Sequence, residues 1–136
     1  MSKFLSVSVT AVFCLVLAIS VPFARSATAQ EQRPAFVIVE RIETTGSETI
    51  QQEYAKLARE ILPKYGARYL ARSQENMLLE GDGALPCCMA ILEFPNIDAV
   101  RRWYASPENQ EASKVRQSGA KFRIVAIQGL PPEKAK

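Results

Sequence analysis

CCMAILEFPNIDAVRRWYASPENQ, residues 87–110, is the stretch that decides the fold. Its first part, residues 87–94, is apolar at every position except Glu93, which is typical of a strand that is covered on both faces. Pro95 ends this strand, and Asn96 is a favourable N-cap for the helix that follows. Ser106 and Pro107 predict a second helix start, because serine caps well and proline suits the first helical position.

Strand patterns also lie on either side of this stretch. Residues 35–42 (AFVIVERI) and 122–128 (FRIVAIQ) are rich in β-branched and aromatic residues, and residues 67–72 (ARYLAR) alternate. Residues 77–80 (MLLE) either extend the 67–72 strand or pair with it, and 81–83 (Gly-Asp-Gly) predict a turn.

A helix is predicted between the first two strands. Thr45 precedes Glu48 by three residues, the spacing of a capping box. Pro63 bends or restarts this helix, and Gly66 ends it. The predicted order is therefore strand, helix, strand, strand, helix, strand. This is an α+β chain with the ferredoxin-like βαββαβ sandwich order.

Helices can cover only one face of such a sheet. The strands at 35–39, 87–92 and 124–127 are apolar on both faces, so the second face also needs a cover. An identical subunit packed sheet to sheet is the simplest one, and we expect a homodimer. The sequence does not tell whether Val37 or Ile91 faces the partner.

The N-terminal residues have the order of a secretory signal peptide. Lys3 is followed by an uncharged apolar run at 4–24 and by the small residues Ala27-Thr28-Ala29. We expect export to a bacterial periplasm or medium, and no stable membrane insertion after cleavage. An uncleaved membrane anchor stays open as the alternative, since 21 residues can span a bilayer. The expected organisation is signal peptide 1–29, linker 30–34, one domain 35–130 and a charged tail 131–136.

Composition excludes several classes of function. The formal net charge of +3 includes Lys3 and Arg25 of the expected signal peptide, so the rest is nearly neutral and indicates no nucleic-acid partner. The chain has no histidine, which excludes Ser-His-Asp and Cys-His catalysis and most zinc and haem sites. We expect neither a metal site nor a cofactor.

Five residues are candidates for binding a ligand: Arg68, Glu93, Trp103, Tyr104 and Arg116. The two aromatic residues form either part of the core or one wall of a pocket. Each arginine either holds a carboxylate by a bidentate fork or is an exposed residue whose aliphatic stem lies over the core. Glu93 can balance the two arginines or pair with one as a salt bridge. An aromatic wall beside an arginine suits a small aromatic acid, which would alter the fluorescence of Trp103.

Cys87 and Cys88 are predicted to be free thiols that serve as two small buried apolar residues, and oxidation or pairing across a dimer in the periplasm stays open. On a regular strand, adjacent side chains point to opposite faces, and an adjacent disulfide needs a distorted backbone. We expect no disulfide within the chain.

The chain resembles a known bacterial family in five separate blocks. These are FVIVERI (36–42), YGARYLAR (65–72), LEG (79–81), LEFPNIDAVRRWYASPENQ (92–110) and IVAIQG (124–129). It is the domain-of-unknown-function family 1330 (DUF 1330), in the dimeric α/β-barrel superfamily. The export signal, Cys87-Cys88 and Asn109 depart from its usual pattern. The resemblance implies a homodimer, in a superfamily that includes cofactor-free monooxygenases and isomerases.

Two functions therefore stay open. The first is a small cofactor-free enzyme, or a related binder of a small organic acid. The second is a non-catalytic periplasmic dimer that binds a ligand or serves as an accessory protein. A closed pocket with a perturbed glutamate would favour the first, and a pocket filled by Leu70, Trp103 and Tyr104 would favour the second.

Cleavage after Ala29 is directly testable. The mature chain is expected to begin at Gln30 and to be recovered from the periplasm, because a small-x-small site ends the apolar run. N-terminal sequencing of protein from the native host checks this. A membrane-bound chain that still begins at Met1 would contradict it.

Overall fold

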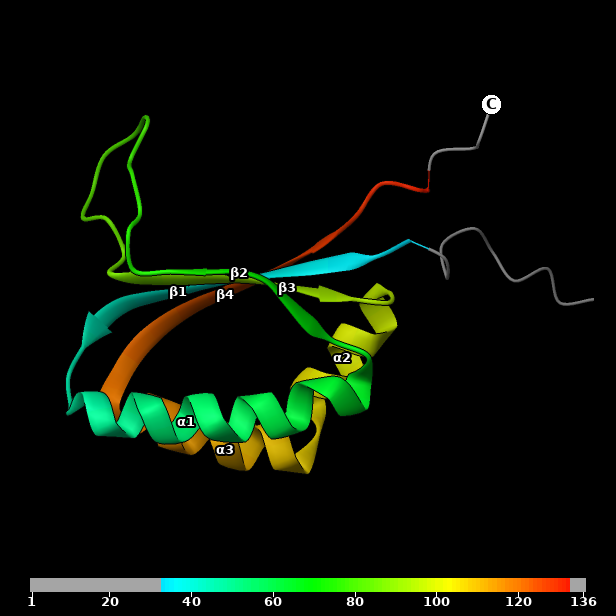
Figure 1. The fold of residues 1–136 in the computed structure, drawn as a ribbon, viewed down its shortest axis with the longest axis horizontal. Coiled ribbons are helices and arrows are strands. Elements are labelled where there is room, and N and C mark those ends of the chain that lie inside the picture. The colour runs from blue at the N-terminus through cyan, green and yellow to red at the C-terminus, as the bar shows by residue number, and fades with distance from the viewer. Residues whose placement is uncertain (1–32, 133–136) are drawn as a thin grey trace, which may run out of the picture.

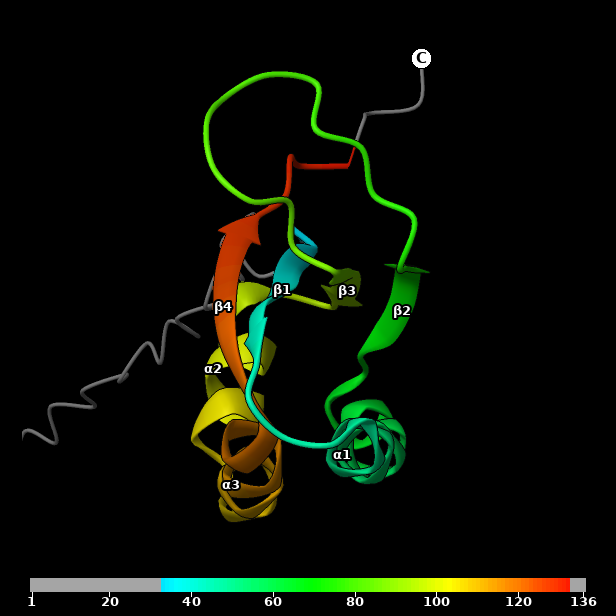
Figure 2. The same cartoon turned by 90° about the vertical axis from the view of Figure 1, so that its left-hand side faces the viewer.

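The computed structural model describes residues 33–132, and it contains one antiparallel sheet with helices on one face (Figures 1 and 2). The strand order is β2-β3-β1-β4. The elements are β1 (Ala35–Thr44), α1 (Glu48–Ile61), the 3₁₀ helix η1 (Leu62–Tyr65), β2 (Arg68–Ser73), β3 (Cys88–Phe94), α2 (Ile97–Ala105), α3 (Pro107–Gly119) and β4 (Ala120–Gln128). The predicted α+β, ferredoxin-like fold is confirmed.

Caps define the two C-terminal helices as predicted. The Asn96 side chain accepts a hydrogen bond from the Ala99 N–H at 2.8 Å, and α2 begins there. Ser106 ends α2 and caps α3, because its hydroxyl accepts from the Asn109 N–H at 3.2 Å. The second predicted helix is therefore two short helices that meet at one serine.

The start of α1 differs from the prediction. Its N-cap is Ser47, not Thr45. The N–H groups of Thr45 and Gly46 instead bind the Gly119 carbonyl, at 3.0 and 2.9 Å. This contact fixes the entry to α1 against the end of α3, and the capping-box spacing from Thr45 to Glu48 is not used.

Gly66 ends η1 in the left-handed region, with φ of 68°. A Cβ there would also lie 2.8 Å from Cγ of Pro95, so both the backbone angle and the space favour glycine. The prediction that MLLE at 77–80 forms or extends a strand is wrong, because residues 74–87 form a loop between β2 and β3. This loop stands on the side of the sheet opposite the helices (Figures 1 and 2).

The two faces of the sheet differ in their cover. The helix-facing residues include the core side chains Val37, Leu92 and Phe94, which are at most 3 % exposed. On the other face, Ile91, Val125 and Ile127 are 37–46 % exposed. Val37 thus faces the helices and Ile91 faces away from them, so of the two only Ile91 lies on the face that a partner subunit could cover.

A bulge divides β2. Arg68 pairs with Glu93, and Tyr69 pairs with Leu92. The next residue of β3, Ile91, pairs with Ala71 and not with Leu70, so the register shifts by one residue between Tyr69 and Ala71. One extra residue reverses the alternation of side chains beyond it. Arg68 and Arg72 lie four positions apart and would share a face on a regular strand, but the bulge places them on opposite faces.

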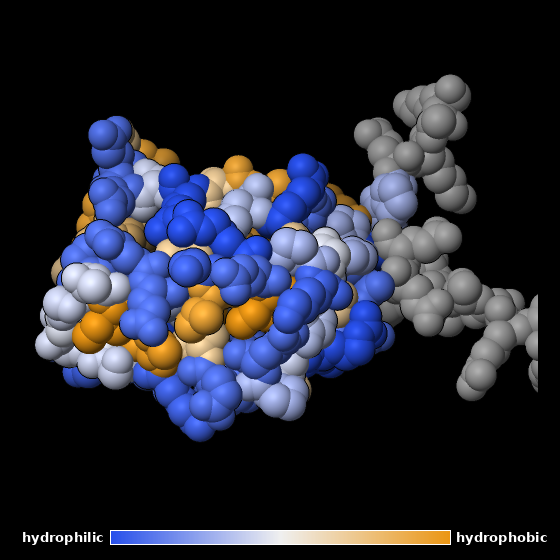
Figure 3. All heavy atoms as spheres, turned by 60° about the horizontal axis from the view of Figure 1, so that its bottom comes forward, coloured by the Kyte–Doolittle hydropathy of each residue, from blue (hydrophilic) through white to orange (hydrophobic). Residues whose placement is uncertain are grey.

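The outer surface of the helix layer is mostly hydrophilic, with a few small apolar groups on it (Figure 3). Between residues 33 and 132, the structure contains no helix that has both the length and the apolar character needed to cross a membrane. The expected signal peptide and its cleavage site lie outside the described residues.

Candidate functional site

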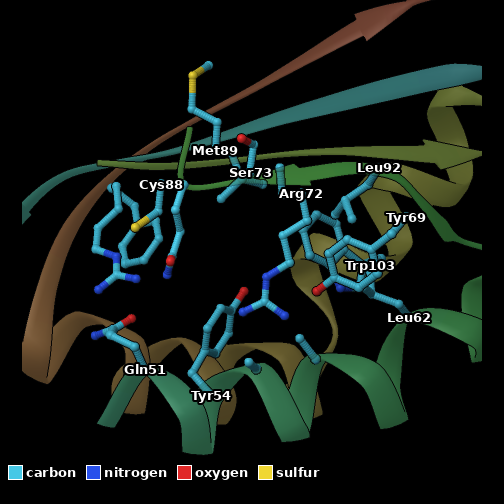
Figure 4. A pocket seen from close by; sticks show the side chains of 17 residues that line it. Gln51, Tyr54, Leu62, Tyr69, Arg72, Ser73, Cys88, Met89, Leu92 and Trp103 are labelled. Carbon is cyan, nitrogen blue, oxygen red and sulfur yellow. The ribbon is translucent and has the colours of Figure 1, made fainter. Parts of the chain in front are cut away.

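A cavity of about 100 Å³ lies between the helix-facing side of the sheet and α1 (Figure 4). It exists because α1 presents the small residues Ala55 and Ala58 to the sheet at this point. Its other walls come from β1, β2, β3, α2 and β4. Its lining includes Val39, Arg41, Gln51, Tyr54, Leu62, Tyr69, Arg72, Cys88, Leu92, Trp103 and Phe122.

Arg72 is the cation that extends into this cavity. Its side chain runs from β2 toward Tyr54 (Figure 4). Among residues 33–132, no carboxylate lies within salt-bridge distance of its guanidinium. Arg72 is accessible to solvent, so its charge is retained without a buried counter-ion. The fork is therefore available to an anion.

Two tyrosines of the cavity lie near Arg72. Burial raises the pKa of Tyr54, and the nearby Arg116 offsets part of the effect. Burial also raises the pKa of Tyr69, against an opposing effect of Arg72. Both phenols are consequently neutral at physiological pH and can donate their O–H to an acceptor.

The positive charge of a second arginine in the lining is balanced by an ion pair. Arg41, 8 % exposed, donates to both carboxylate oxygens of Glu48, at 2.7 and 3.3 Å. These hydrogen bonds lower the pKa of Glu48, and the more distant charge of Arg72 acts in the same direction. With Arg41 and Glu48 paired, the positive charge of Arg72 is uncompensated at the cavity.

Arg116 lies behind the cavity wall. It is 3 % exposed, and its guanidinium carbon is 5.4 Å from the ring centroid of Tyr54 and 5.1 Å from that of Phe122. Its side chain also donates to Ser113, and its Nε has no partner within the described residues. Arg116 therefore supports two cavity-lining rings by cation–π contact but does not itself line the cavity.

The five predicted ligand residues are not brought together. Trp103 is 3 % exposed and lines the cavity, with its ring centroid 5.1 Å from that of Phe94. Tyr104 is 49 % exposed on the outside of α2. Arg68 forms an ion pair with Glu93 on the open face of the sheet, which is the salt bridge considered as the alternative.

The two cysteines differ from the prediction in their orientation. Their Sγ atoms are not bonded, but they lie 2.7 Å apart rather than on opposite faces. The reason is that β3 begins at Cys88, so Cys87 is outside the regular pleat. Cys88 lines the cavity, and burial raises its pKa to about 11.

Arg72 and Tyr54 were missed at the sequence level. Tyr54 recurs with Ile50, Leu57 and Ile61 at intervals of three or four residues along α1, so the sequence does not distinguish it from a core residue. Arg72 belongs to the quoted YGARYLAR block, but its face depends on the bulge between Tyr69 and Ala71, for which the sequence has no marker such as glycine. Within the described residues, no three His, Cys, Asp or Glu side chains are grouped as a metal site would need.

The sequence was compared with protein-family models and with curated proteins. The family model described as a domain of unknown function (DUF1330) matches residues 34–130. None of the curated proteins matches the chain.

Solved structures share the fold at low sequence identity. A protein of unknown function from Rhodopseudomonas palustris has a TM-score of 0.60 at 18 % identity, covering 74 % of this chain and 85 % of its own. A dimeric protein of unknown function with a ferredoxin-like fold from Bacteroides fragilis has a TM-score of 0.52 at 17 % identity, covering 70 % and 95 %. A dabb family protein with a ferredoxin-like fold from Mesorhizobium loti has a TM-score of 0.53 at 16 % identity, covering 73 % and 99 %.

The raised pKa of Tyr54 predicts a pH dependence of stability. The unfolded chain loses this proton near pH 10 and the folded chain only at higher pH, so the free energy of unfolding falls as pH rises above about 10. In Tyr54→Phe the free energy of unfolding is expected to fall less steeply with pH, and Tyr69, Cys88 and Lys64, whose pKa values are also raised, contribute to the fall that remains. Urea unfolding of the wild type and of Tyr54→Phe at a series of alkaline pH values measures how steeply the free energy of unfolding falls with pH. An unchanged slope in the variant would contradict the assignment.

Proposed function

The chain belongs to the DUF1330 family, and we propose that this member binds a small planar organic acid in the cavity beneath β2 and β3. The observation that carries the proposal is Arg72, a guanidinium that extends into the cavity and has no ion-pair partner within the described residues (Figure 4). We propose further, from residues 1–29, that the protein acts outside the cytoplasm.

The polar groups of the cavity favour an anion. The Arg72 fork matches a carboxylate, with two parallel N–H donors. Tyr54 and Tyr69 supply neutral hydroxyl donors on either side of the same space. Glu48 is held by Arg41 and does not cancel the charge of Arg72.

The size of the cavity limits the ligand. At about 100 Å³ it is smaller than the roughly 150 Å³ engineered apolar cavity that holds one benzene molecule. A single ring, or a planar acid of similar size, therefore fits only with its carboxylate near the solvent-accessible Arg72. Trp103 and Tyr69 supply aromatic walls for the ring.

The arrangement favours binding over proton-transfer catalysis. A general base in such a site needs a pKa close to the working pH. The carboxylate beside the cavity, Glu48, has a lowered pKa because it accepts hydrogen bonds from Arg41, and it is accordingly a weak base. Trp103 lines the cavity without filling it, so the space remains available to a ligand.

Trp103 is the only tryptophan of the chain and reports on this cavity. Benzoate and its ring-substituted relatives are expected to change its emission saturably. Arg72→Ala is expected to weaken binding roughly 10- to 150-fold, because a hydrogen bond to a charged group contributes about 1.5–3 kcal/mol. Arg72→Lys keeps the charge and loses the bidentate fork, so its affinity for benzoate should lie between those of the wild type and Arg72→Ala.

Arg68→Ala is the matched control. Arg68 is on the same strand but on the opposite face, so benzoate affinity should stay at the wild-type value. Benzyl alcohol, which lacks the charge, should bind no better to wild type than to Arg72→Ala. Equal losses in both arginine variants, or no emission change with any of the acids, would overturn the proposal.

We propose, second, that the protein is a homodimer formed through the open face of its sheet. The exposed apolar side chains there are Leu70, Ile91, Val125 and Ile127. Two ion pairs flank them, Arg68–Glu93 toward β2 and Arg123–Glu40 toward β4. An apolar patch with a polar rim is typical of a protein interface.

A second copy is the occupant that the arrangement supports. The β2–β3 loop stands on this same side of the sheet and exposes Met77, Leu78, Leu79 and Leu85, so it can pack beside a partner sheet (Figure 2). The similar Bacteroides fragilis structure is of a dimeric protein. Since sheets pack face to face with interdigitating side chains, two such faces can cover each other.

Ile91→Asp is expected to give a folded monomer, because it places a charge in the proposed interface. Val37→Asp should instead abolish folding, since Val37 is fully buried against the helices and an unpaired buried charge costs several kcal/mol, about the stability of a small domain. Sedimentation and circular dichroism separate the two outcomes. A wild-type monomer at micromolar concentration, or an Ile91→Asp dimer, would contradict the proposed interface.

A further inference from the structure

Cys87 and Cys88 bring two thiols together at the point where the β2–β3 loop enters β3. Their Sγ atoms are 2.7 Å apart, which is much closer than two unbonded sulfur atoms normally approach. A disulfide bond measures about 2.05 Å, so only a small shift separates the pair from bonding distance. We propose that this pair is a vicinal dithiol that undergoes reversible thiol–disulfide exchange with small external disulfides.

The two cysteines differ in accessibility, and this assigns their roles. Cys87 is exposed, whereas Cys88 is partly buried at the cavity wall. An external disulfide can reach Cys87, but it meets the wall around Cys88. Cys87 is therefore the attacking thiol and Cys88 the resolving one.

The reaction is balanced as two exchanges. The Cys87 thiolate attacks one sulfur of the external disulfide, forms a mixed disulfide and releases one small thiol. The Cys88 thiolate then attacks the Cys87 sulfur and releases the second small thiol. Two electrons pass from the cysteine pair to the external disulfide, and the two cysteine protons end on the released thiols.

Adjacency makes the product suited to reversible chemistry rather than to a structural role. Consecutive Cα atoms lie about 3.8 Å apart across a trans peptide, below the roughly 4.4–6.8 Å usual for disulfide-bonded residues. The closed form is thus strained and more easily reduced. The charge of Arg41, the register partner of Cys88 in β1, offsets only part of the effect of burial, which raises the pKa of Cys88 and slows the closing step.

Treatment of the full chain with glutathione disulfide tests the proposal. Trypsin releases both cysteines in one peptide, residues 73–101, because no lysine or arginine lies between Arg72 and Arg101. In wild type this peptide is expected to lose the mass of two hydrogens and to regain it with dithiothreitol. Cys88→Ser should stop at a stable glutathione adduct on Cys87. Cys87→Ser should react at least about tenfold more slowly, because its remaining thiol is less accessible.

The same reaction in urea is the control for the contribution of the fold. Closure of the mixed disulfide is expected to be faster in the folded chain, where the two sulfur atoms are held together. The full chain also contains Cys14, which lies outside the 73–101 peptide. Equal closure rates, glutathione adducts that persist on the wild-type 73–101 peptide, or disulfides formed between chains through Cys87 or Cys88 in place of the internal one would each overturn the proposal.

Discussion

The central constraint on this protein is that β1, a strand apolar on both faces, lies in a sheet that has helices on only one side. Among residues 33–132, the α-helices that can cover the sheet are α1, α2 and α3, and all three lie below it (Figure 1). On the covered side, Val37, Leu92 and Phe94 form the core. On the other side, the same strands present apolar residues to solvent, and this asymmetry is the physical basis for the proposed dimer.

Within the covered side, small residues determine where the cavity lies. Trp103 of α2 fills the space beneath the paired ends of β1 and β3, where it packs on Phe94. Toward the other end of the sheet, α1 contributes Ala55 and Ala58, which are too short to reach β2 and β3. The gap that results is bordered by longer polar side chains, so a difference in side-chain volume along one layer produces the candidate site.

The elements of the fold could be predicted because their signals are local. Asn96, Ser106 and Gly66 act through their own backbone and side-chain geometry, and each has the role that the sequence indicates. The start of α1 could not be placed in this way, because the carbonyl that holds it belongs to Gly119, more than 70 residues away along the chain. The loop at 77–80 was also misread, since its apolar residues resemble a strand but have no strand beside them.

The candidate site was predictable only in part, and the reason lies in the bulge of β2. Strict alternation would put Arg72 beside Arg68 on the open face, where it could contribute only to the surface. The single inserted position sends Arg72 into the cavity and leaves Arg68 to pair with Glu93. A second irregularity determines the positions of Cys87 and Cys88. Cys87 lies outside the regular pleat of β3, and this brings the two sulfur atoms together. Both proposals thus depend on local irregularities of the sheet, one a bulge within β2 and the other at the start of β3.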